Sequence, residues 1–137
     1  MNENFLLTTP LAQRLYHKCA EELPVIDYHN HLSVEDVIAN RQFGDIAELW
    51  LLSDPYKHRA MRICGVEERL ITGGASNFEK FEAWCRIFPG LVGNPLQHWS
   101  QMELARVFDI DLFLNAENAR RIWDAANEKL KDQSLFA

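Results

Sequence analysis

The sequence predicts a mainly α-helical protein with one convincing β-strand. Residues that cap helices recur along the chain, each followed by apolar residues at helical spacing, and only Val25–His31 has the pattern of a short apolar strand. With 137 residues, the chain is long enough for no more than one compact unit. Hydrophobic residues make up 47% and charged residues 25%, which is typical of a folded globular protein.

The first predicted helix begins at Thr9 and Pro10. Thr9 can accept a backbone N–H, and proline at the first helical position loses no hydrogen bond. One face of this helix carries apolar residues every fourth position: Leu11, Leu15, Cys19 and Leu23. Pro24 then ends the helix, and the apolar run Val25–His31 follows.

Six further helices are predicted by their starting residues. These are Ser33 with Asp36, Asp45 with Glu48, Asp54 with Pro55, Ser76 with Glu79, Asn94 with Pro95, and Asn115. Gly65 is positioned to end the helix that begins at Asp54 and Pro55, in a left-handed backbone conformation. Apolar stripes support the later ones: Phe78, Phe81, Cys85 and Phe88, then Leu96, Trp99 and Phe108, then Ala119, Ile122, Trp123, Ala126 and Leu130. Apolar residues alternate with other residues in the segment 108–114, as in a strand, but the segment is too short to assign its secondary structure.

Two histidines, His29 and His31, stand one residue apart at the end of the predicted strand. Successive side chains of a strand point to opposite faces, so both imidazoles project on one side and Asn30 on the other. Imidazole nitrogens suit a divalent metal, zinc above all, but a catalytic centre needs about three protein ligands. The pair is therefore half a site. Possible further metal ligands are Asp27, His17, His58 and His98, but none of them stands at a sequence spacing that identifies it as a ligand.

Composition and charge exclude several classes of partner. The net charge of −6 offers no broad cationic surface to a nucleic acid. Neither a basic leader nor an apolar run of about 20 residues is present, so we expect a cytoplasmic protein that does not bind a membrane. The three cysteines are widely spaced, which favours buried free thiols.

Two longer motifs, "DPYKHRAMR" and "GNPLQHW", follow the histidine pair in order. With them, nearly the whole chain resembles the amino-terminal portion of the uronate (glucuronate) isomerases, a family of the amidohydrolase superfamily. The resemblance implies an N-terminal fragment of a (β/α)₈ TIM barrel. Residues 1–32 would then form an N-terminal helix and the first barrel strand, and residues 33–137 a helical subdomain inserted after that strand.

The resemblance also implies a reaction. Family members interconvert hexuronates between aldose and ketose forms, for example D-glucuronate with D-fructuronate and D-galacturonate with D-tagaturonate. It implies a divalent metal on His29 and His31, with zinc expected. Tyr56 matches the family's active-site tyrosine, as a catalytic and substrate-binding residue, and Arg59 is expected to bind the substrate carboxylate. We expect a hexuronate as the small-molecule partner and a homo-oligomer.

The chain departs from the family in length, because a complete barrel has eight strands. We therefore expect an amino-terminal fragment without isomerase activity of its own. A single strand cannot pair its own backbone, so Val25–His31 should pair with another chain, adopt an irregular conformation or become disordered. A noncatalytic helical module and a metal-dependent hydrolase of the same superfamily remain as alternatives.

Other conspicuous side chains have simpler interpretations. His58 and His98 are expected to be hydrogen-bonded structural residues, and His17 a surface residue. Aromatic residues at helical spacing are usually core, and this is the prediction for the four tryptophans: Trp50, Trp84, Trp99 and Trp123.

Overall fold

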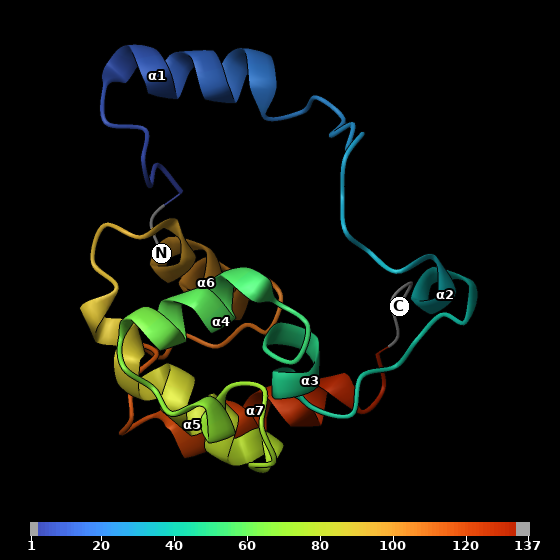
Figure 1. The fold of residues 1–137 in the computed structure, drawn as a ribbon. Coiled ribbons are helices and arrows are strands. Elements are labelled where there is room, and N and C mark those ends of the chain that lie inside the picture. The colour runs from blue at the N-terminus through green and yellow to red at the C-terminus, as the bar shows by residue number, and fades with distance from the viewer. Residues whose placement is uncertain (1–2, 134–137) are drawn as a thin grey trace. The chain divides into compact units, whose positions relative to one another are not determined.

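The computed structural model describes residues 3–133 and divides the chain into two compact units, Met1–Ser33 and Val34–Ala137. The prediction of no more than one compact unit is therefore wrong. Length alone could not show this, because it does not tell which residues contact one another. Figure 1 shows the helices of both units along the chain.

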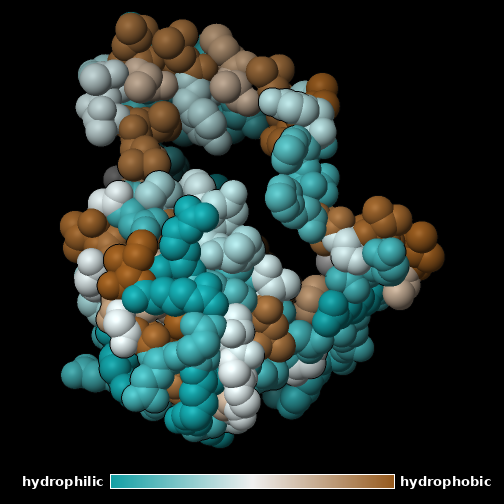
Figure 2. Space-filling view, in the orientation of Figure 1, coloured by the Kyte–Doolittle hydropathy of each residue, from teal (hydrophilic) through white to brown (hydrophobic). Residues whose placement is uncertain are grey.

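In the first unit the predicted helix begins where its cap residue stands. The Thr9 hydroxyl oxygen accepts the Ala12 N–H at 3.1 Å, and α1 (Pro10–Leu15) continues into a π-helical turn, η1 (Tyr16–Ala20). The helical structure ends before Pro24, the predicted end. The leucines of the apolar stripe, Leu11, Leu15 and Leu23, are exposed. Figure 2 shows brown, hydrophobic residues on the surface of this unit. His17 is exposed as predicted, and its ring contacts Glu21 and Asn4.

The segment 25–31 has an irregular backbone, and no β-strand occurs anywhere in residues 3–133. Val25 is 93% exposed and Ile26 82% exposed. The predicted strand is thus absent, and the irregular conformation expected of an unpaired segment is confirmed. The physical reason is that strand hydrogen bonds need a neighbouring strand, and the described residues provide none.

The second unit is a helical bundle with its own hydrophobic core. Its helices are α2 (Val34–Ile38), α3 (Ile46–Trp50), α4 (Pro55–Ile63), α5 (Asn77–Ile87), α6 (Pro95–Arg106) and α7 (Ala119–Leu130), with 3₁₀ turns η2 (Glu68–Leu70) and η3 (Phe88–Gly90). Helices α3, α5 and α7 contact one another, and their fully buried side chains include Ile46, Phe81, Trp84 and Ile122 (Figure 1). None of the described helices is both long and apolar enough to cross a membrane.

Most predicted helix starts of this unit are confirmed by their caps. Ser76 and Glu79 form both halves of a capping box. The Asp45 carboxylate accepts the Glu48 N–H at 2.8 Å, but the Glu48 carboxylate accepts the N–H of Gly44, not that of the cap itself. The last helix starts at Ala119, not at Asn115, because residues 115–118 form a separate turn. In that turn the Asn115 side chain accepts the Asn118 N–H at 2.8 Å.

Residues 108–114 alternate between buried and exposed side chains without forming a strand. Phe108, Ile110 and Leu114 are buried, whereas Asp109 and Asp111 are exposed. The alternation therefore indicated which side chains face the core and did not indicate strand pairing.

The side chain of Gln101 on α6 takes the place of a neighbouring strand. Its amide nitrogen donates to the Leu112 carbonyl at 2.8 Å, and its amide oxygen accepts the Leu114 N–H at 3.2 Å. Two backbone groups of the segment are satisfied in this way.

Two predictions about buried residues need correction. All three cysteines are free, but only Cys85 is buried, and burial, with the charge of Glu82, raises the pKa of its thiol to about 12. Cys19 and Cys64 are exposed. Trp50 and Trp84 lie in the core as predicted and Trp123 is half-buried against it, whereas Trp99 is 54% exposed.

The role of Gln101 is testable by replacing it with methionine, which keeps the length of the side chain and removes the amide. We expect Gln101→Met to lower the free energy of unfolding by about 1–3 kcal/mol, because two part-buried backbone groups lose their partner. Urea denaturation measures the change. Gln97→Met is the control on the same helix, since it removes one longer bond, to the Phe88 carbonyl at 3.3 Å. An equal loss in both variants would contradict this role.

Candidate active site

His29 and His31 lie close together on the exposed segment that follows the first helix. Their ring centroids are 5.5 Å apart, and the ring planes are inclined by 42°. Two local bonds bend the backbone around them: Asp27 accepts the His29 N–H at 3.3 Å, and Asn30 accepts the Leu32 N–H at 3.1 Å. Such side-chain bonds replace the strand pairing that this segment lacks. Asp27 therefore holds the backbone of His29.

The spacing of the two rings is compatible with a shared metal ion. With metal–nitrogen distances of about 2.0–2.1 Å and tetrahedral angles, the centroids of two coordinating imidazoles lie roughly 5 Å apart. Within residues 3–133, no group of three or more potential ligands is close enough to hold a metal. The possible further ligands, Asp27, His17, His58 and His98, do not form such a group with His29 and His31. Two histidines could supply part of a metal site, and any further ligands would have to come from outside this group.

Tyr56 and Arg59 lie one turn apart at the start of α4. Tyr56 is 62% exposed, and the Arg59 guanidinium carbon lies 6.0 Å from the centroid of the tyrosine ring. Arg59 is exposed as well, and none of the ion pairs found among residues 3–133 involves it. The structure thus confirms that the two side chains share one face of the helix.

Asp54 fixes the first turn of this helix. Its carboxylate accepts the backbone N–H of Tyr56 at 2.9 Å and that of Lys57 at 3.1 Å, as well as the Lys57 ammonium at 2.8 Å. Burial tends to raise the pKa of Asp54, but the hydrogen bond and charge of Lys57, with the two backbone donors, outweigh it and hold the pKa below its usual value.

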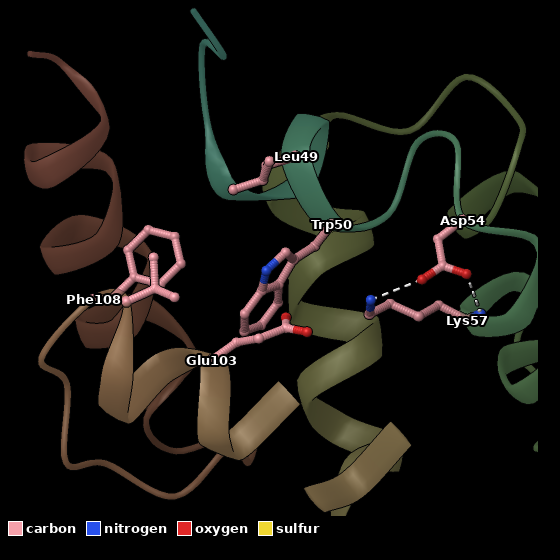
Figure 3. Close-up of a pocket in the computed structure, with 7 residues that line it drawn as sticks. Leu49, Trp50, Asp54, Lys57, Glu103 and Phe108 are labelled. Atoms are coloured by element: carbon pink, nitrogen blue, oxygen red, sulfur yellow. Dashed lines mark hydrogen bonds and ion pairs between the residues drawn. The ribbon is translucent and has the colours of Figure 1, made fainter. Parts of the chain in front are cut away.

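The Lys57 side chain is directed from α4 toward Trp50 (Figure 3). Only 7% of Lys57 is exposed, and its ammonium lies 5.7 Å from the centroid of the Trp50 ring system. A hollow of about 340 Å³ adjoins this contact, and burial raises the pKa of Glu103 on its wall, although the charge of Lys57 acts in the other direction. A partly buried ion pair and the face of the Trp50 indole therefore support the helix turn that carries Tyr56.

A second hollow, of about 420 Å³, lies on the exposed side of Tyr56. It is lined by Tyr56, Asn94, Pro95 and Trp99, so it lies between the start of α4 and the first turns of α6. Sequence reasoning placed Trp99 in the core and gave Asn94 only a capping role. The available signal was that all these residues belong to the two long motifs.

The remaining histidines do not join the site. A ring nitrogen of His58 contacts the Leu51 carbonyl, which confirms the structural role predicted for it. His98 is half-buried on α6. His29 and His31 belong to the first unit, and Tyr56 and Arg59 belong to the second.

Comparison with known proteins establishes the family. Residues 1–137 match the glucuronate isomerase family, and the chain belongs to it. It is 48% identical over 137 residues to the uronate isomerase of Endomicrobium trichonymphae and 49% identical to that of Geobacillus stearothermophilus; each match covers 100% of this chain and 29% of the relative. The crystal structure of uronate isomerase from Thermotoga maritima matches with a TM-score of 0.92 at 39% identity, over 98% of this chain and 30% of that one. The chain thus spans less than a third of the length of these relatives.

The role of Asp54 predicts a pH-dependent stability. Asp54→Asn keeps an oxygen acceptor for the backbone but loses the charge that pairs with Lys57. Because the pKa of Asp54 is lowered by folding, its contribution is complete above the unfolded pKa of about 3.9 and is lost as the pH falls below it. We expect Asp54→Asn to lower the free energy of unfolding by about 1–3 kcal/mol at pH 6 and by much less near pH 3.

Denaturation of both proteins across this pH range measures the difference. Asp124→Asn is the control, because Asp124 pairs with Arg120 on the surface of α7. A gap between Asp54→Asn and the wild type that stays constant down to pH 3 would contradict the ion-pair role.

Proposed function

We propose that the protein containing this chain is a uronate isomerase that interconverts the aldose and ketose forms of hexuronates. The observation that carries the proposal is the match to the glucuronate isomerase family over all 137 residues. The relatives named above are uronate isomerases, and their length indicates that the activity belongs to a longer protein. We do not expect these 137 residues to turn over substrate alone.

His29 and His31 are the residues that would hold a divalent metal, with zinc the expected ion. A bound metal would act as a Lewis acid on substrate oxygens. The adjacent ring positions on an exposed segment support this role, and the missing ligands would come from the rest of the protein. We propose that this segment becomes the first strand of a (β/α)₈ barrel of the amidohydrolase type, where it would gain the partner strands that it lacks here.

Tyr56 would assist the proton-transfer steps of the reaction. Isomerisation removes a proton from the carbon beside the aldehyde and returns one to the neighbouring carbon, by way of an enediol or enediolate. A phenol can donate a hydrogen bond to the substrate oxygen on which negative charge develops. The exposed position of Tyr56 on a firmly capped helix turn supports this role.

Arg59 would bind the carboxylate that distinguishes a hexuronate from a neutral sugar. Its planar guanidinium can form two parallel hydrogen bonds to a carboxylate. The absence of an acidic partner for Arg59 among the described ion pairs leaves this capacity for a ligand. The proposal also includes a cytoplasmic location and a homo-oligomeric assembly.

The metal role predicts the behaviour of a double variant of the full-length protein. We expect His29→Ala with His31→Ala to lose the bound metal, measured by elemental analysis of the purified protein, and to lose hexuronate isomerisation. His17→Ala should retain both, since His17 contacts Glu21 and Asn4 on the first unit. Full metal content in the double variant would refute the assignment. Hydrolysis without isomerisation in the wild type would favour a hydrolase.

The proton-transfer role predicts a selective loss of turnover. Tyr56→Phe removes the hydroxyl and keeps the ring, so we expect kcat to fall by about 10²–10⁴-fold, while the protein retains its metal and its thermal stability. Steady-state kinetics with D-glucuronate and D-galacturonate measure the effect. Tyr16→Phe, at an exposed tyrosine after α1, is the matched control. A kcat within about threefold of the wild type would exclude Tyr56 from the chemistry.

A further inference from the structure

The two motifs that distinguish this sequence meet at one hollow on the second unit. Tyr56 comes from the first motif, and Asn94, Pro95 and Trp99 come from the second. The hollow, of about 420 Å³, falls in the size range of small-molecule sites. Of these residues, only Tyr56 has a role in the function proposed above.

Trp99 differs from the other tryptophans of the chain in its exposure. Trp50 and Trp84 are almost completely buried, whereas Trp99 leaves 54% of its surface in solvent. An exposed indole beside an exposed phenol presents a broad amphipathic aromatic surface, which is typical of binding sites and rare elsewhere on a soluble protein.

We infer that Trp99 and Tyr56 form an aromatic platform for the carbon chain or ring of a sugar acid. The inference rests on the function proposed above and extends it by naming Trp99 as a residue that determines substrate affinity. In this arrangement the indole covers the C–H face of the sugar, and the neighbouring residues contact its polar groups.

Polar groups of the right kind surround this platform. The Asn94 amide oxygen accepts the Leu96 N–H at 3.0 Å, so the amide NH₂ is the group that can donate to a sugar hydroxyl. The Arg59 guanidinium lies against the Tyr56 ring and carries the charge that a carboxylate requires. An aromatic face and an amide donor in the lining of the hollow, with a cation next to the Tyr56 ring, complement a polyhydroxylated acid better than they complement a purely apolar protein surface.

The experiment uses the full-length protein with Trp99→Leu, which loses the aromatic face, and Trp99→Phe, which keeps part of it. Ile63→Ala is the control, because Ile63 is exposed on α4 and does not line the hollow. Three quantities are measured: the KM and kcat for D-glucuronate, the dissociation constant of D-gluconate, and the thermal midpoint. D-gluconate is a sugar acid without the aldehyde, so it binds without reacting.

We expect Trp99→Leu to raise the KM and the D-gluconate dissociation constant by about five- to tenfold. The kcat should stay within about threefold, and the thermal midpoint should change little, since more than half of Trp99 is exposed to solvent. Trp99→Phe should show a smaller loss of affinity, and Ile63→Ala none.

Two results would overturn the inference. The first is unchanged affinity in Trp99→Leu. The second is a raised KM with a lowered thermal midpoint but unchanged D-gluconate binding, which would assign the indole to contact with another part of the protein. Isomerase activity that survives either result would leave the proposed function standing. Conversely, Trp99-dependent D-gluconate binding in a protein without isomerase activity would support the platform and reject the isomerase.

Discussion

The candidate site on the second unit depends on the bonds of one carboxylate, that of Asp54. It accepts two backbone N–H groups of the first turn of α4 and the ammonium of Lys57. Each interaction satisfies a group that would otherwise lose its partner at a helix start or in a partly buried position. Because Tyr56 and Arg59 belong to the same helix, the orientation of their side chains follows from this anchor.

The anchor continues into the core of the unit. The Lys57 ammonium lies over the Trp50 ring system, and Trp50 contacts Phe108 edge to face, with ring centroids 6.1 Å apart. The exposed Tyr56 is thus connected to aromatic side chains of the interior. The connection runs through the Asp54 carboxylate, which accepts backbone N–H groups of the helix turn, and through the Lys57 ammonium. This connection gives the exposed Tyr56 a fixed backbone, which in the function proposed above would reduce the freedom lost on substrate binding.

The sequence predicted features of this protein that depend on near neighbours and missed features that depend on distant ones. Helix starts at Thr9, Asp54 and Ser76 were predictable because a cap bonds to a backbone group two or three residues away. The irregular backbone at 25–31, where a strand was predicted, and the exposed position of Trp99 depend on which other segments lie alongside. Local spacing in the sequence does not show which segments are neighbours. For the same reason, the alternation of residues 108–114 indicated which of their side chains are buried but not that Gln101 would bond to their backbone.

The same distinction applies to the two halves of the candidate chemistry. Tyr56 and Arg59 lie on a helix that satisfies its own backbone bonds and is held by an ion pair, so their local geometry requires nothing beyond the second unit. His29 and His31 lie on a segment whose backbone bends through bonds to Asp27 and Asn30, because residues 3–133 contain no strand that could pair with it. Short side-chain bonds of this kind are weaker than a strand ladder and are readily exchanged for one. In the function proposed above, the segment of His29 and His31 should therefore become ordered only when neighbouring strands pair with it, which would link metal affinity to completion of the fold.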